Sequence, residues 1–157
     1  MLTQALLYSE MIEGASKSYE MELTSKAQKA KMNFGGLETM AEQMKVFNKI
    51  SYKKQAKMLV ETVESLKKGE NEFVKLVDMY KTQDVDGMLE SMLGDLEEME
   101  GQDDLLDNRN KNWIPQIKKM SKNEKVFYAV GAAHLGGKNG VIRLLRKEGF
   151  KVTPVLK

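Results

Sequence analysis

Most apolar positions in the middle of this chain recur with a helical period. Within residues 51–68 and 73–80 the apolar side chains are three or four positions apart, which places them on one helical face. The polar turn at residues 68–70 predicts that these two helices form a hairpin. Further helices are predicted for residues 18–30 and 88–99, the second broken near Gly94 and ending near Gly101. Thr39 and Glu42 have the spacing of a capping box, so another helix is expected to begin there.

A further predicted helix, residues 105–120, places polar and apolar side chains on one face. Its apolar members are Leu106, Trp113, Ile114 and Ile117. Asn110 falls on the same face, and Arg109 lies at its margin. Buried amide and guanidinium groups need partners. These two side chains therefore either join the helix to a carboxylate or a backbone carbonyl, or point into a site.

The C-terminal third changes from a purely helical pattern to a predicted βαβ unit. Two short apolar runs, Val126–Val130 and Phe150–Val155, are predicted strands on either side of a helix over residues 139–148. A strand-like link is expected over residues 31–37, with Glu38 at its end. The pattern predicts an α+β (α/β-like) fold that is mostly helical and contains a small, largely parallel β-sheet.

The chain's only histidine, His134, lies between the first predicted strand and the helix that follows it. Glycine and alanine surround it in the segment Gly131–Gly137 and are expected to let the backbone bend and leave the imidazole uncovered. Imidazole is the side chain best suited to proton transfer or metal ligation near neutral pH. Two interpretations stay open: a satisfied structural histidine, or a catalytic or metal-ligating one.

Composition narrows the remaining possibilities. A chain of 157 residues with 41% hydrophobic content can bury one sizeable core, which predicts a single domain over residues 1–157. A net charge of +2 gives no argument for a nucleic-acid partner. No apolar run is long enough for a membrane span or a targeting signal, so the compartment stays open. The absence of cysteine excludes thiolate nucleophiles and ligands.

Three blocks of sequence resemble the TraB/GumN family, which includes the Tiki-type metalloproteases. The blocks are Gly36-Leu37-Glu38-Thr39 with Glu42-Gln43; Arg109-Asn110 with Trp113 and Ile117; and residues 130–137 with the Gly140-Val-Ile-x-Leu-Leu-x-x-x-Gly149-Phe-x-Val152 pattern. Their order and separation span most of the chain. The resemblance implies a partial domain similar in fold to ChaN and the erythromycin esterases.

The same resemblance implies a metal-dependent hydrolytic site that is peptidase-like, with a peptide or protein substrate. His134 would be a metal ligand or catalytic base, and Glu38 the partner carboxylate; Arg109 and Asn110 would orient the substrate or the carboxylate shell. A histidine and a glutamate can hold a divalent ion such as manganese, cobalt or zinc. Arg109 could also stabilise developing oxyanion charge.

One part of the family pattern is missing. Family members have an N-terminal segment in which a strand leads into Gly-Thr-x-His, whereas this chain has no such segment and no second histidine. The chain is therefore expected to be the C-terminal portion of a larger domain, with an incomplete site and weak metal affinity. A chain without its sheet partners is expected to expose strand edges, which favours a homodimer. The alternative function is a non-catalytic binding or regulatory module that uses Met-rich helices.

Overall fold

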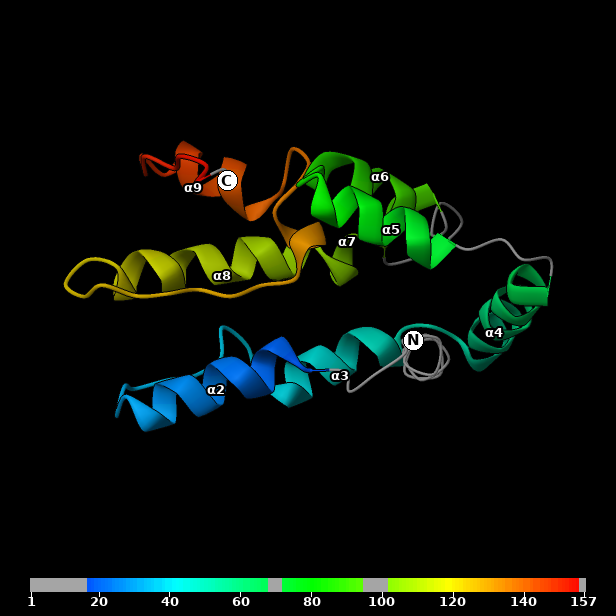
Figure 1. The fold of residues 1–157 in the computed structure, drawn as a ribbon, viewed down its shortest axis with the longest axis horizontal. Coiled ribbons are helices and arrows are strands. Elements are labelled where there is room, and N and C mark those ends of the chain that lie inside the picture. Colours follow the sequence, from blue (N-terminus) through cyan, green and yellow to red (C-terminus); the bar gives the residue numbers. More distant parts are fainter. Residues whose placement is uncertain (1–16, 68–71, 95–101, 156–157) are drawn as a thin grey trace. The chain divides into compact units, whose positions relative to one another are not determined.

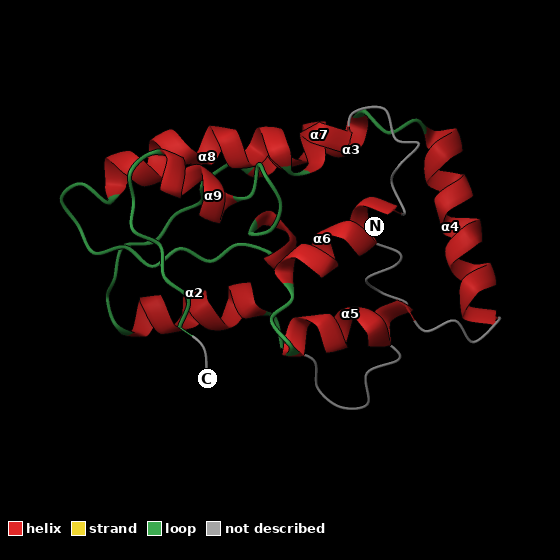
Figure 2. Cartoon of the chain, turned by 90° about the horizontal axis from the view of Figure 1, so that it is seen from above, coloured by secondary structure: helices red, strands yellow, loops and turns green. Residues whose placement is uncertain are grey.

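The computed structural model describes residues 17–67, 72–94 and 102–155, and within these ranges it contains helices and loops but no strand (Figures 1 and 2). The chain divides into two compact units. The first combines residues 1–36 with 53–70, and the second combines residues 37–52 with 71–157. Compact units are not by themselves separate domains, so the expectation of a single domain stays a prediction.

The first unit contains α2 (Tyr19–Lys29) and all but the first residue of α4 (Tyr52–Lys67). Helix α2 begins as its sequence requires, because the Ser18 hydroxyl accepts a hydrogen bond from the backbone N–H of Met21 at 3.3 Å. Acidic residues in its first turn and lysines in its last turn complement the helix dipole. The helix predicted for residues 18–30 is thus confirmed, and its stability is local because none of its residues is buried.

Helix α4 confirms the predicted helix over residues 51–68, and some side chains of its apolar face are exposed. The side chains of Tyr52 and Val60 are 90% and 55% exposed. The turn of the predicted hairpin, residues 68–70, lies outside the described residues. Helix α5 (Glu72–Lys81), which was to pair with α4, belongs to the second unit.

The second unit contains the other helices of the described residues. They are α3 (Met40–Asn48), α5, α6 (Val85–Gly94), α7 (Gln102–Leu105), α8 (Asp107–Met120), the 3-10 turn η1 (Ala132–His134) and α9 (Val141–Lys147). The capping box before α3 is confirmed: the Thr39 N–H donates to Glu42 Oε2 at 2.7 Å, and the Glu42 N–H donates to Thr39 Oγ1 at 3.2 Å. Helix α6 confirms most of the helix predicted from residue 88, and residues 95–101 lie outside the described part.

The core of the second unit is built on α8. Its buried residues are Asn110, Trp113, Ile114 and Ile117, which is the face that the helical period predicts. Val141 of α9 completes the buried cluster, and α9 packs beside α8 (Figures 1 and 2). Helix α5 packs against α6, and α6 contacts η1, so the loop that carries His134 lies between α6 and α8.

The predicted α+β class is wrong for the described residues, and so is the parallel sheet. Residues 126–130, 150–155 and the link 31–37 are loops (Figure 2). Within the first of these, Tyr128 and Val130 do pack against the core while Phe127 is 75% exposed, so the two-residue alternation is present. A strand also needs a neighbour for its backbone N–H and C=O groups, and no such pairing is found in the described residues. The apolar alternation over residues 126–130 therefore places side chains against the core without forming a sheet.

None of the helices in the described part of the chain is long and apolar enough to cross a bilayer.

Candidate functional site

Helix α8 aligns the side chains of the site along one face. Arg109, Asn110 and Trp113 lie within its first two turns, with Asn110 on the buried stripe and Arg109 at its margin. Asn110 is 1% exposed and Trp113 is 4% exposed. The helix therefore presents one amide, one guanidinium and one indole to the two segments that pack on it, one ending at Glu38 and the other carrying His134.

Asn110 anchors the loop that carries His134. Its Nδ2 donates to the backbone carbonyl of Asn139 at 3.0 Å and to that of His134 at 3.4 Å. Its Oδ1 lies 2.7 Å from Nδ1 of His134. Both amide protons and the amide oxygen thus have partners, which a fully buried asparagine requires. The segment from His134 to Asn139 is held on α8 at three points by a single side chain.

These contacts fix the tautomer of His134. Because Asn110 Nδ2 faces two carbonyl oxygens, Asn110 Oδ1 must be the atom that faces the imidazole. An amide oxygen can only accept, so Nδ1 of His134 carries the proton and donates to it. In the neutral ring, Nε2 then holds the lone pair. This is the arrangement in which histidine ligates a metal or accepts a proton, with its other nitrogen hydrogen-bonded to an oxygen.

The imidazole is buried, contrary to the expectation of an uncovered side chain. His134 is 8% exposed, and its ring lies 4.5 Å, centroid to centroid, from the ring of Trp113 at an interplanar angle of 44°. The pKa of His134 is lowered to about 4, chiefly by burial and secondly by the positive charge of Arg109, while the carboxylate of Glu38 acts in the opposite direction. His134 is therefore neutral at pH 7.

Glu38 and Arg109 form a two-point ion pair. Arg109 Nε donates to Glu38 Oε2 at 3.0 Å, and Nη2 donates to Oε1 at 2.5 Å. The third nitrogen, Nη1, donates to the carbonyl of Leu105 at 2.9 Å. Both side chains are less than one-fifth exposed. This fork geometry holds the carboxylate in one orientation and strengthens both hydrogen bonds.

Trp113 connects the two pairs. The guanidinium carbon of Arg109 lies 5.2 Å from the centre of the indole, within range of a cation–π interaction, and the ring of His134 also lies next to the indole. Glu38, Arg109, Trp113, His134 and Asn110 thus form one continuous cluster. The indole Nε1 is the buried side-chain polar atom without a partner among the described residues.

Two glycines of the His134 loop are required by close backbone approach. A Cβ on Gly140 would collide with the carbonyl oxygens of Gly136 and Leu135, and a Cβ on Gly136 would collide with the carbonyl oxygen of Val85. Gly131, just before the turn, has a φ of −57° and room for a methyl group. The glycines after His134, rather than the one before it, therefore let the loop fold tightly onto α6.

Comparison with known proteins identifies the family. The model of the TraB/PrgY/gumN family matches residues 1–154. The chain belongs to the TraB/PrgY/gumN family. Comparisons with curated proteins and with solved structures give no significant match. The match confirms the resemblance drawn from the three sequence blocks, and all three blocks contribute to the cluster around Trp113 in this member of the family.

The cluster brings together all four residues selected from the sequence. Asn110 and Arg109 each hold one of the other two: Asn110 orients His134, and Arg109 orients Glu38. From the sequence, Arg109 and Asn110 were expected either to join α8 to a carboxylate or carbonyl, or to point into a site. Both descriptions apply, because the groups that these two side chains bind belong to the candidate site. In the described residues, no group of three or more histidine, cysteine or acidic side chains could hold a metal ion together.

Sequence reasoning missed the role of Trp113 in the cluster and two residues that support the His134 loop. Trp113 was expected only as a core residue, yet its ring lies next to both the guanidinium of Arg109 and the imidazole of His134. Asn139 and Asp107 were not selected, although Asn139 Nδ2 donates to Asp107 Oδ2 and fixes the far end of the His134 loop. Two features of the sequence could have pointed to this contact: Asp107 lies in the first turn of α8, and Asn139 lies next to Gly140, which precedes α9.

Proposed function

We propose that this chain carries part of a metal-dependent hydrolytic site of the TraB/PrgY/gumN family, peptidase-like in its chemistry. His134 and Glu38 would hold the metal ion, and Asn110 and Arg109 are the side chains that position them. The observation that carries the proposal is the hydrogen bond between Asn110 and Nδ1 of His134, 2.7 Å long, which leaves the Nε2 lone pair for a ligand or a proton.

The donor chemistry fits a divalent ion in part. A neutral imidazole and an ionised carboxylate suit manganese, cobalt or zinc. A carboxylate has about four lone-pair positions, so Glu38 can accept two hydrogen bonds from Arg109 and still offer an oxygen. Such an ion lowers the pKa of bound water and polarises a scissile carbonyl. Two donors next to a guanidinium support only weak binding, as expected for an incomplete site.

Each residue has a distinct role in this proposal. His134 is neutral at pH 7 and can ligate or accept a proton without first losing one. Arg109 acts as a positioning residue for Glu38, because two of its N–H groups donate to that carboxylate and a third donates to the carbonyl of Leu105. Asn110 is a positioning residue for the imidazole. A peptide or protein is the proposed substrate.

The test is a Co²⁺ titration of the purified chain at pH 7, followed by calorimetry and by visible absorbance. The test variants are His134→Asn, whose amide can still donate to Asn110, and Glu38→Gln, which keeps the shape of the side chain. The matched control is Glu148→Gln, because Glu148 is an exposed carboxylate that pairs with Lys118 outside the cluster. Mn²⁺ is titrated in parallel against the proton signals of the only histidine.

Saturable binding that is lost in both test variants and kept in the control supports the proposal. Binding that survives in His134→Asn would overturn the assignment of His134 as a ligand. No binding by the wild-type chain at millimolar Co²⁺ would leave the chain without metal chemistry of its own and favour the second candidate below.

The second candidate function is a protein-binding or regulatory module. The observation that favours it is the exposure of methionines on α3: Met40 is 72% exposed and Met44, one turn later, is 40% exposed. Flexible, polarisable methionines on one helical face suit an adaptable docking surface. The double variant Met40→Ser with Met44→Ser should lose the binding of a fluorescent apolar dye while keeping its helical circular-dichroism signal.

A further inference from the structure

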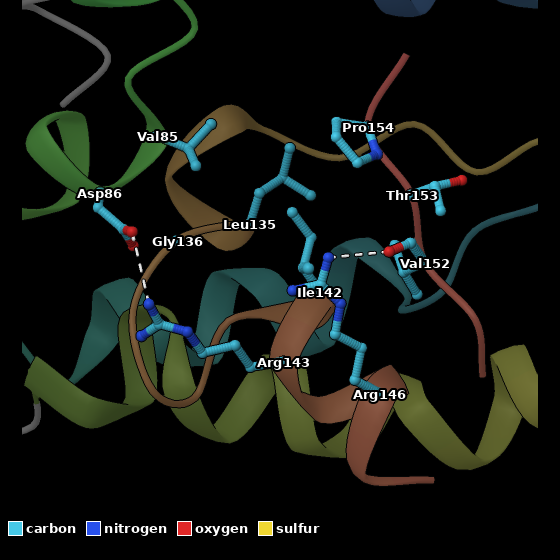
Figure 3. Close-up of a pocket in the computed structure, with 10 residues that line it drawn as sticks. All are labelled: Val85, Asp86, Leu135, Gly136, Ile142, Arg143, Arg146, Val152, Thr153 and Pro154. Atoms are coloured by element: carbon cyan, nitrogen blue, oxygen red, sulfur yellow. Dashed lines mark hydrogen bonds and ion pairs between the residues drawn. The ribbon is translucent and has the colours of Figure 1, made fainter. Parts of the chain in front are cut away.

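A cavity of about 250 Å³ lies in the second unit, on a different set of side chains from the cluster around Trp113 (Figure 3). Its walls are the first turn of α6, the loop after η1, α9 and residues 152–154. Neither His134 nor Glu38 lines it, although Leu135 and Gly136 directly follow the histidine. The cavity therefore adjoins the candidate site without being part of it.

The lining combines an apolar floor with two guanidinium groups. Leu135, Ile142 and Pro154 are among its apolar members. The charged members are Arg143, Arg146 and Asp86, so the cavity has two positive charges and one negative charge. A ligand with an apolar body and a single negative charge complements both features.

Each arginine has one recorded partner among the described residues, and neither partner uses the whole guanidinium. Arg143 Nη2 lies 3.5 Å from Asp86 Oδ2, and both side chains are about half exposed. Arg146 Nη2 donates to the carbonyl of Val152 at 2.8 Å (Figure 3). A guanidinium has five N–H donors in a planar fork that matches a carboxylate. The loose pair at Arg143 contrasts with the short fork of Arg109 and Glu38 in the cluster.

Asp86 has a separate structural role that keeps it in place. Its Oδ1 accepts a hydrogen bond from the backbone N–H of Gly137 at 2.7 Å, so the carboxylate links α6 to the loop after η1. An asparagine could keep this bond through its own oxygen but would carry no charge. Asp86 can therefore be neutralised without removing the contact that holds the wall of the cavity.

We propose that this cavity binds the carboxylate of a small aliphatic acid, such as the C-terminal residue of a peptide with an apolar side chain. Arg143 and Arg146 hold the carboxylate, and Leu135, Ile142 and Pro154 surround the aliphatic group. The site is a subsite for an apolar acid and does not depend on metal binding or on hydrolysis. The cavity volume is suited to about one acylated aliphatic residue, so we expect a Kd on the order of 1 mM.

The test is a titration of the isotope-labelled chain with three ligands, followed by backbone amide chemical shifts. N-acetyl-leucine carries a carboxylate and an amide, 4-methylpentanoate carries the carboxylate alone, and N-acetyl-leucinamide carries no charge. Both acids should shift the amides of residues 135–143 and 152–153, and the neutral amide should not. Tighter binding of N-acetyl-leucine indicates a peptide terminus, and tighter binding of 4-methylpentanoate indicates a free aliphatic acid. Either result supports the carboxylate site.

Three variants make the charge argument specific. Arg143→Gln should weaken the binding of the acids about tenfold, as expected for the loss of a charge-assisted hydrogen bond. Asp86→Asn should tighten it by roughly two- to fivefold, because a competing carboxylate is removed. Lys147→Gln is the matched control, since Lys147 is an exposed cation on α9 that does not line the cavity.

Equal binding of the neutral amide and the acids would overturn the proposal, and so would equal weakening by Lys147→Gln and Arg143→Gln. Failure of N-acetyl-leucine to shift any amide at 20 times the expected Kd, roughly 20 mM, would also overturn it. His134→Asn should leave this binding unchanged, so the carboxylate site and the proposed hydrolytic function can fail separately.

Discussion

Acidification should destabilise this protein through one side chain, His134. Its pKa is lowered to about 4 in the folded chain, chiefly by burial. An imidazole in an unfolded chain has a pKa of about 6.5. The unfolded state therefore binds a proton more readily, and protonation favours unfolding as the pH falls from about 6.5 toward 4. Well above about pH 6.5 the imidazole is neutral in both states, so its burial no longer lowers the unfolding free energy through protonation.

The magnitude follows from the two pKa values. At pH 7 the difference in proton binding costs only about 0.2 kcal/mol of unfolding free energy. At pH 5 it costs about 2 kcal/mol, because the unfolded histidine is almost fully protonated and the folded one is not. Lowering the pH from 7 to 5 should thus reduce the unfolding free energy by about 2 kcal/mol through His134 alone.

Urea unfolding at pH 7, 6 and 5 measures this effect, with His134→Asn as the control that cannot titrate. The variant is expected to be less stable at pH 7, since it loses the ring contact with Trp113, but its stability should change little from pH 7 to 5. Because His134 is the only imidazole, its carbon-bound proton signals report the pKa directly. Parallel pH dependence of the wild type and the variant, or a midpoint near 6.5, would refute the reasoning.

Three further predictions concern the cluster and its supports. A double-mutant cycle by urea unfolding, with Glu38→Gln and Arg109→Met, should give a coupling free energy of about 2 kcal/mol. Additive effects of the two substitutions would mean that the ion pair contributes nothing to stability. Gly140→Ala should lower the unfolding free energy by more than about 2 kcal/mol, because a Cβ meets two backbone carbonyl oxygens, while Gly131→Ala changes it by less than about 1 kcal/mol. Thr39→Ala should cost about 1 kcal/mol and shorten α3 in hydrogen exchange; equal protection of the first turn would contradict the capping role.

The helices were predictable because their signals are local. The Ser18 cap, the capping box at Thr39 and Glu42, and the buried stripe of α8 all depend on residues within a few positions of one another. The burial of an apolar face is not local. Tyr52 and Val60 fit a helical stripe but stay exposed, since a stripe is buried only where another element covers it.

The prediction of strands was wrong for the same reason: a strand depends on contacts that are not local. An alternation of apolar residues over 126–130 shows which side chains face the core, and Tyr128 and Val130 do so. It cannot supply a neighbouring strand, which comes from elsewhere in the chain or from another chain. The expected homodimer would supply such a neighbour, and it stays a prediction.

The sequence alone determined the family, the helical segments and the buried face of α8, and it suggested four candidate site residues, because these depend on residue type and spacing. Only the tertiary structure decided how those residues act on one another. It placed Trp113 next to both Arg109 and His134, gave Asn110 the role of fixing the imidazole tautomer, and buried a histidine that glycine-rich surroundings had suggested would be exposed. These relations depend on contacts between residues up to 71 positions apart, as in the pair of Glu38 and Arg109, and a pattern of neighbouring residues does not encode which distant groups meet.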